Sequence, residues 1–163
     1  MAVALPRPVP RVARLLALLV PAGAMATALT AQYGFGLSPC EMCWWQRYAH
    51  IAALVFALAA FVVPGVRPAR LLVWLAVAAI ATSGLLGFYH AGVEYHWWEG
   101  ITTCSTTHLS GDPLDAIMNA PIVRCDVPAW TLFGISMAGY NGVGSLGAAA
   151  LIAVLIGRQR QKV

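Results

Sequence analysis

Four long apolar segments constrain the fold of this chain more than any other feature. They cover approximately residues 15–35, 44–63, 71–89 and 131–156. Each is long enough to cross a bilayer as a helix, which takes about 20 residues. Only 10% of the 163 residues are charged, against about 25% in a soluble domain. We therefore predict an all-α membrane protein, with residues 1–163 forming a single four-helix transmembrane domain.

The charged residues are segregated between the two sides of these segments. Eight of the ten cationic residues lie at the chain termini or between the second and third segments: Arg7, Arg11, Arg14, Arg67, Arg70, Arg158, Arg160 and Lys162. All six acidic residues lie on the other side: Glu41, Glu94, Glu99, Asp112, Asp115 and Asp126. The positive-inside rule then places both termini in the cytoplasm. The net charge of +4 is explained by this topology, and we expect a lipid bilayer and no nucleic acid as the partner.

The first apolar segment has two interpretations. Arginines followed by a short apolar run and small residues resemble a cleavable signal peptide. The segment continues to Phe35 without a polar break, which favours a retained membrane anchor. Cleavage stays open as the alternative.

All four cysteines fall in the two predicted outer loops. Cys40 and Cys43 lie in the short loop, and Cys104 and Cys125 lie in the long loop over residues 91–130. Outer loops face an oxidising compartment, where disulfides persist. One interpretation is structural: a Cys104–Cys125 bridge would stabilise its loop by about 3 kcal/mol.

Other uses of the four cysteines fit less well. A four-thiolate zinc site normally has two closely spaced pairs, and Cys104 and Cys125 are too far apart. Covalent haem needs a histidine directly after the second cysteine, where this chain has Trp44.

Thiol–disulfide exchange is the interpretation that the position of Cys40 and Cys43 favours. A C-x-x-C at a helix N-terminus has its thiolate stabilised by free backbone N–H groups and the helix dipole. Arg47 follows Cys43 by four residues, on the same helix face, although it could instead be an interface anchor that snorkels outward. Electrons from a dithiol at the lipid boundary need an acceptor, and a lipid-soluble quinone is our hypothesis.

The chain resembles the DsbB family of bacterial inner-membrane disulfide-generating proteins. The resemblance rests on four spans with both ends inside, on Pro39 before the C-x-x-C with Arg47 after it, and on the outer-loop cysteine pair. Residues 89–94, 97–100 and 128–130 are also similar to one branch of that family.

The resemblance implies a redox relay with catalytic Cys40, Cys43, Cys104 and Cys125. A periplasmic DsbA-like thiol oxidase would form a transient mixed disulfide with Cys104, and Cys125 would resolve it by engaging Cys40. Cys43 would contact ubiquinone or menaquinone, with Arg47 and His90 as quinone-binding residues, and no metal is implied. The expected location is the inner membrane, with the redox loops facing the periplasm.

Two other functions remain open from the sequence. One is a quinone enzyme similar to vitamin K epoxide reductase, and the other is a membrane scaffold without catalysis whose loops are pinned by disulfides. We also predict a short helix starting at Asp112 and Pro113. We interpret His50 as incidental. Glu94 follows His90 by four residues, so it either orients His90 or is solvated, and we favour the solvated position.

Overall fold

The computed structural model describes residues 8–102, 104 and 123–158. Its helices are α1 (Arg11–Gly34), α2 (Glu41–Val62), α3 (Val66–Glu94) and α5 (Met137–Arg158). All four are long and apolar enough to cross a membrane, which confirms the predicted fold class. The short helix predicted at Asp112 and Pro113 lies outside the described residues.

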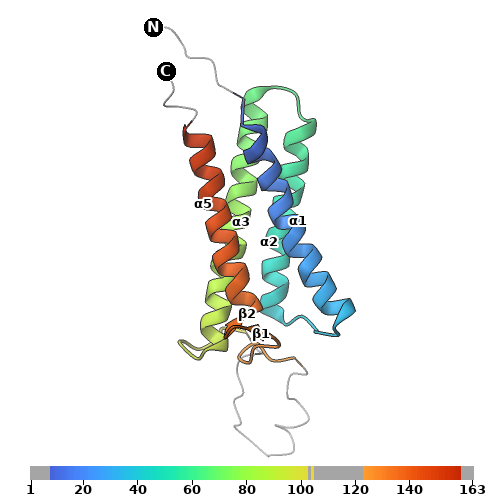
Figure 1. Cartoon of the computed structure of the whole chain (residues 1–163), viewed down its shortest axis with the longest axis vertical. Coiled ribbons are helices and arrows are strands. Elements are labelled where there is room, and N and C mark those ends of the chain that lie inside the picture. Colours follow the sequence, from blue (N-terminus) through green and yellow to red (C-terminus); the bar gives the residue numbers. More distant parts are fainter. Residues whose placement is uncertain (1–7, 103, 105–122, 159–163) are drawn as a thin grey trace, which may run out of the picture.

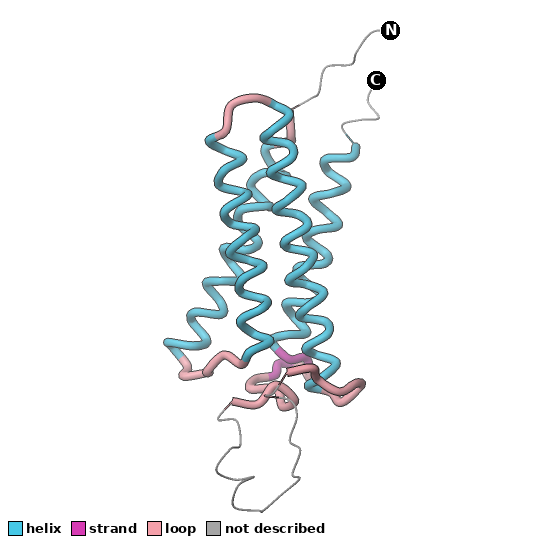
Figure 2. Tube along the Cα trace, turned by 180° about the vertical axis from the view of Figure 1, so that it is seen from behind, coloured by secondary structure: helices cyan, strands magenta, loops and turns pink. Residues whose placement is uncertain are grey.

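The four helices form an up-and-down bundle (Figure 1). Helix α3 packs along both α2 and α5, while α1 packs mainly against α2 and less against α5. The start of α2, the end of α3 and the start of α5 meet at one end of the bundle, which we call the cysteine end. The tight connection between α2 and α3 lies at the opposite end, as Figure 2 shows from behind.

The half of the bundle away from the cysteine end is packed with small and branched apolar residues. Its core includes Ala53, Ala57, Val73, Ile80 and Ile152, each no more than 1% exposed. Alanines let neighbouring helices approach closely, and the branched side chains fill the space between them. This half has the composition expected of a structural membrane core.

Glycines bring α3 and α5 into direct backbone contact. A methyl group added at Gly87 would lie 2.8 Å from the Ala138 carbonyl oxygen, and one at Gly142 would lie 3.0 Å from the Phe88 nitrogen. Only residues without a side chain permit such an approach. Gly147, in contrast, has open space around it, so it takes no part in this close approach.

The fourth predicted span begins too early. Residues 131–136 form a hairpin of β1 (Thr131–Leu132) and β2 (Ile135–Ser136), which pair antiparallel. The two turn residues, Phe133 and Gly134, both have positive φ angles of 50° and 76°, as a two-residue hairpin turn requires. The hydroxyl of Tyr95 donates to the Gly134 carbonyl oxygen at 2.9 Å, so the hairpin is tied to the end of α3.

The third predicted span ends too early. Residues 90–94 continue α3, although the long outer loop was predicted to start at 91. The reason is local packing: the Trp98 indole donates to the Tyr89 carbonyl oxygen at 2.9 Å and lies against Gly92. As a result Glu94 is buried, at 9% exposed, and its interpretation as a solvated residue was wrong.

Candidate redox site

Helix α2 begins at the C-x-x-C motif. Cys40 is the N-cap, with an extended backbone, and its sulfur accepts a hydrogen bond from the Cys43 backbone N–H at 3.3 Å. Both residues are free thiols, and their sulfurs lie 2.8 Å apart. The first turn of a helix presents unpaired N–H groups and the positive end of the dipole. The predicted helix start is therefore confirmed, and it favours a thiolate here.

The two sulfurs of this motif are not equivalent. Cys40 is 5% exposed, and its hydrogen bond to Cys43, together with burial, raises the pKa of the Cys40 thiol. The raised pKa favours the thiol form of Cys40, so negative charge on the pair is favoured at Cys43, the cysteine deeper in the helix.

The second cysteine pair is a disulfide between Cys104 and Cys125. Cys125 is completely buried, whereas Cys104 is partly exposed. The Cys125 N–H donates to the Cys104 carbonyl oxygen at 3.2 Å. This hydrogen bond holds together the two loop segments that the disulfide joins. Next to it, Arg124 and Asp126 form an ion pair at the surface. The hydrogen bond that Arg124 donates to Asp126 lowers the pKa of the Asp126 carboxyl.

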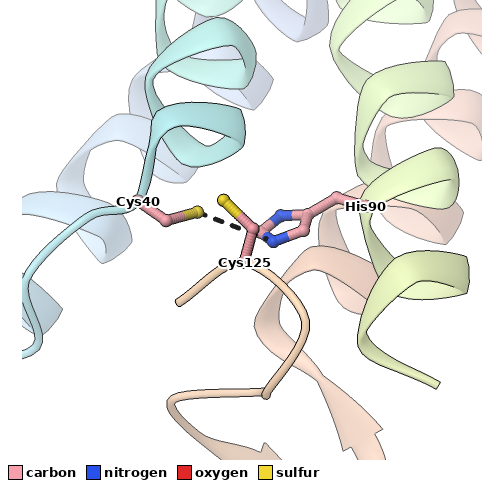
Figure 3. Close-up of side chains that lie close together, drawn as sticks. All are labelled: Cys40, His90 and Cys125. Carbon is pink, nitrogen blue, oxygen red and sulfur yellow. Dashed lines mark hydrogen bonds between the residues drawn. The ribbon is translucent and has the colours of Figure 1, made fainter. Parts of the chain in front are cut away.

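The structure brings the two cysteine pairs together around one histidine. The reactive atoms of Cys40, Cys125 and His90 all lie within 4.8 Å of one another. Figure 3 shows these three side chains close together. Cys40 comes from the start of α2, His90 from α3 and Cys125 from the loop. Sulfurs this close need little movement to exchange a disulfide. The same three groups are metal-ligand types, but the disulfide occupies the Cys125 sulfur and leaves it unavailable as a thiolate ligand.

His90 is held in a fixed orientation. Its Nε2 lies 3.6 Å from the Cys40 sulfur and 3.8 Å from a Glu94 carboxylate oxygen. Its Nδ1 lies 3.0 Å from the Gln46 side-chain nitrogen, and the Cys125 backbone also hydrogen-bonds the ring. The imidazole therefore joins α2, α3 and the loop at the point where the sulfurs meet.

A cavity of about 380 Å³ opens beside Cys43 and runs between α1, α2 and α5. Its wall is mostly apolar. The polar groups on the α2 side are Cys43, Gln46, Arg47 and His50, which recur at the spacing of one helix face. A mainly apolar cavity with a few convergent polar groups is typical of a small-molecule site.

Arg47 crosses this cavity to α1. Its guanidinium donates to the Gln32 side-chain oxygen at 2.5 Å and to the Ala28 carbonyl oxygen at 3.2 Å. It also lies 5.1 Å from the Trp44 ring centroid. With 7% exposure, the side chain does not snorkel outward as the anchor interpretation requires. The cation is instead available to a molecule in the cavity.

Sequence reasoning missed three polar residues that the structure places at this site. Buried Gln46 and His50 form a hydrogen-bonded group with partly buried Asn141 on the cavity wall. A signal for His50 was present, because it follows Cys43 by seven residues and Arg47 by three. Asn141, in the last apolar segment, had no such neighbour to single it out.

Comparison with known families agrees with this geometry. The family model described as disulfide bond formation protein DsbB matches residues 10–155. The chain belongs to the DsbB family. The resemblance seen in the sequence is therefore confirmed, and the chain is a multi-pass membrane protein with disulfide-forming oxidoreductase activity.

Curated members of the DsbB family are similar over most of their length. Disulfide bond formation protein B of Acidovorax sp. (strain JS42) is 32% identical over 152 residues, covering 82% of this chain and 80% of the relative. The protein of the same name from Chromohalobacter salexigens is 31% identical over 146 residues, covering 76% and 82%. An uncharacterized protein of Rickettsia prowazekii is 28% identical over 124 residues, covering 72% and 71%. No solved structure matches the chain.

Proposed function

We propose that this DsbB-family protein is a quinone-dependent thiol oxidase that reoxidises a periplasmic DsbA-like dithiol protein. The observation that carries the proposal is the meeting of Cys40 with Cys125, while Cys43 opens onto the apolar cavity. One pair thus faces the loop side and the other faces the membrane side. A relay from a protein partner to a quinone needs one pair on each side.

The first step is disulfide exchange with the partner protein. A partner thiolate attacks the Cys104 sulfur, the Cys104–Cys125 bond breaks and Cys125 leaves as a thiolate. Partial exposure of Cys104 beside buried Cys125 supports attack at Cys104. With Cys125 free to engage Cys40, the second partner thiol attacks the mixed disulfide, and Cys104 leaves as a thiolate as the oxidised partner is released.

The second step transfers the electron pair to the C-x-x-C motif. Cys125 attacks Cys40 in an oxidised Cys40–Cys43 pair, and Cys43 leaves as a thiolate. Cys104 then attacks the Cys125–Cys40 bond, which restores the loop disulfide and leaves Cys40 as a thiol. The arrangement in the structure, a loop disulfide beside two thiols at Cys40 and Cys43, corresponds to the end of this step.

The residues around the cavity fit a quinone. The apolar wall suits a lipid-soluble ring, Cys43 supplies sulfur at one edge, and Arg47 supplies a cation for an oxygen. Cys40 and Cys43 would give two electrons and two protons to ubiquinone or menaquinone and would form the Cys40–Cys43 disulfide that the second step uses. His90 also lines the cavity, so its predicted contact with the quinone stays a proposal beside its contact with Cys40.

We place the protein in the bacterial inner membrane with the cysteine end toward the periplasm. The arginines at the opposite end support this orientation through the positive-inside rule. The cysteine end would then face an oxidising compartment, where a DsbA-like protein and quinone keep disulfides forming.

Quinone reduction in membranes tests the function. With a reduced DsbA-like dithiol protein and quinone supplied, wild type should form quinol and oxidised partner in equal amounts. Cys104→Ser and Cys125→Ser should each abolish this turnover, and Thr82→Ser, an exposed substitution on α3, should leave it unchanged. Undiminished quinone reduction by either cysteine variant would refute the electron path.

A disulfide-pinned scaffold accounts for less of the site. It explains the Cys104–Cys125 bridge, but it gives no reason for free thiols at Cys40 and Cys43 beside a cavity. Counting free thiols before and after adding the reduced partner separates the two functions, because bridges in a scaffold do not exchange.

A further inference from the structure

Two side-chain amides, buried Gln46 and partly buried Asn141, have orientations fixed by backbone carbonyls. Gln46 Nε2 donates to the Met42 carbonyl oxygen at 3.2 Å, and Asn141 Nδ2 donates to the Ser83 carbonyl oxygen at 3.2 Å. A carbonyl oxygen only accepts hydrogen bonds. The amide nitrogens must therefore face these carbonyls, which leaves each amide oxygen on the opposite side.

The orientation of Asn141 fixes the protonation pattern of His50. His50 Nε2 lies 2.9 Å from Asn141 Oδ1, and Ser145 Oγ donates to the same oxygen at 2.8 Å. Because Oδ1 only accepts, Nε2 must carry the hydrogen. A neutral imidazole with hydrogen on Nε2 has a lone pair on Nδ1.

His50 is a neutral side chain with one unused acceptor. It is 3% exposed, and within the described residues no carboxylate pairs with it, so a charge there would be costly. Its Nδ1 is buried and has no hydrogen-bond partner among residues 8–102, 104 and 123–158. Buried polar atoms normally have a partner, and His50 lines the cavity beside Arg47.

We propose that His50 Nδ1 accepts a hydrogen bond from a hydroxyl of the quinol form of the ring bound in this cavity. This inference rests on the proposed function, because it assigns a residue to the same quinone site. His50 follows Cys43 by two helical turns, about 10 Å deeper along α2. His50 also lies three residues beyond Arg47, about 4.5 Å further along α2, so a six-membered ring with an oxygen at each end is long enough to contact both.

The contact discriminates between the two forms of the ring. A quinol hydroxyl donates to the lone pair, whereas a quinone carbonyl oxygen only accepts and gains nothing from it. His50 therefore favours the reduced form. A tenfold preference would raise the two-electron potential of the bound ring by about 30 mV, which draws electrons from the cysteines.

Binding of the two ring forms tests the role of His50. The probes are decylubiquinone and decylubiquinol, and the protein carries Cys40→Ser so that no dithiol exchanges electrons with the ring. His50→Gln keeps a donor near Asn141 and removes the acceptor at the Nδ1 position. We expect it to weaken quinol binding about tenfold, the worth of one hydrogen bond, and to change quinone binding less than about twofold.

Controls separate this contact from a structural effect. Ser145→Ala removes another donor to the same amide oxygen and should change the binding of both forms equally or not at all. Equal weakening of both forms by His50→Gln, or no change in either, would overturn the inference while leaving the proposed function intact. Failure of the Cys40→Ser parent protein to bind quinone would instead overturn both.

A second measurement needs no variant at position 50. Methylating the hydroxyls of decylubiquinol one at a time removes a donor and keeps the ring. In the parent protein one of the two monomethyl ethers should bind about tenfold more weakly than the quinol. Equal affinity of the quinol and both ethers would contradict the contact even if His50→Gln failed to fold.

Discussion

The two cysteine pairs of this protein differ in almost every physical respect. Cys104 and Cys125 are disulfide-bonded in a connection outside the helices, and the Cys125 N–H also donates to the Cys104 carbonyl oxygen. Cys40 and Cys43 are thiols at the first turn of α2, fixed by a helix cap and the ring of His90. A pair that meets a large protein partner needs access, while a pair that meets a small ring needs a rigid position.

The close approach of Cys125 to Cys40 connects the accessible pair with the rigid pair. Buried Cys125 approaches buried Cys40, so the exchange between pairs takes place away from solvent. Partly exposed Cys104 and cavity-lining Cys43 lie at the two ends of the path. In each pair one cysteine is directed outward and the other toward the opposite pair.

The largest expected effect comes from removing the outward-directed cysteine of the helix pair. Cys43→Ser should lower quinone reduction at least about 1000-fold, as loss of a nucleophile does, because Cys43 is the sulfur beside the cavity. The loop pair should still exchange with the reduced partner. Quinone absorbance and partner thiol counts measure the two halves separately, and loss of both halves would show that the pairs are not independent.

A smaller effect is expected from Arg47 on the helix side. Arg47→Met keeps the apolar stem and removes the cation, so the KM for quinone should rise about tenfold or more, the worth of a charge-assisted hydrogen bond. Arg124→Met is the matched control, because Arg124 is exposed beside the loop pair. An unchanged KM in Arg47→Met would reassign this residue to holding α1.

Packing beneath the helix pair can be changed without touching a sulfur. Gly87→Ala places a methyl group 2.8 Å from the Ala138 carbonyl oxygen, and overpacking of this kind costs about 1–3 kcal/mol. Gly147→Ala meets nothing within 4 Å and should leave stability unchanged. Thermal unfolding in detergent compares them, and equal midpoints would show that α3 and α5 adapt to the added methyl group.

The smallest effect is expected at the surface ion pair beside Cys125. Because the pKa of Asp126 is lowered in the folded protein, the stability it contributes is present above the ordinary carboxyl pKa and is lost as pH falls through the lowered value.

Arg124→Gln should change the rate of partner exchange less than about fivefold. A larger change that persists in high salt would show that Arg124 contacts the partner itself.

Much of the fold followed from the sequence because membrane helices are long, apolar and flanked by segregated charge. The errors arose where tertiary contacts override hydropathy. Trp98 folding over Gly92 extends α3 past residue 90, and the bond from Tyr95 supports a hairpin where residues 131–136 are apolar enough to look like a span.

The site was predictable only in part. Motif spacing placed Cys43 and Arg47 on one helix face, and the family resemblance supplied the pairing of Cys104 with Cys125, which the structure contains. The hydrogen bonds from His50 to Asn141 and from Gln46 to His90 join residues 91 and 44 positions apart. Such contacts depend on which helices are neighbours, and periodicity along one segment does not contain that information.

Direct cross-linking of the buried sulfurs tests the central claim that electrons pass from Cys125 to Cys40. In membranes carrying Cys43→Ser and Cys104→Ser, only Cys40 and Cys125 remain, and mild oxidation should give a Cys40–Cys125 disulfide detectable by peptide mass spectrometry. The complementary protein with Cys40→Ser and Cys125→Ser is the control and should cross-link far more slowly. Free thiols at Cys40 and Cys125 after oxidation, or faster cross-linking in the control, would contradict the relay.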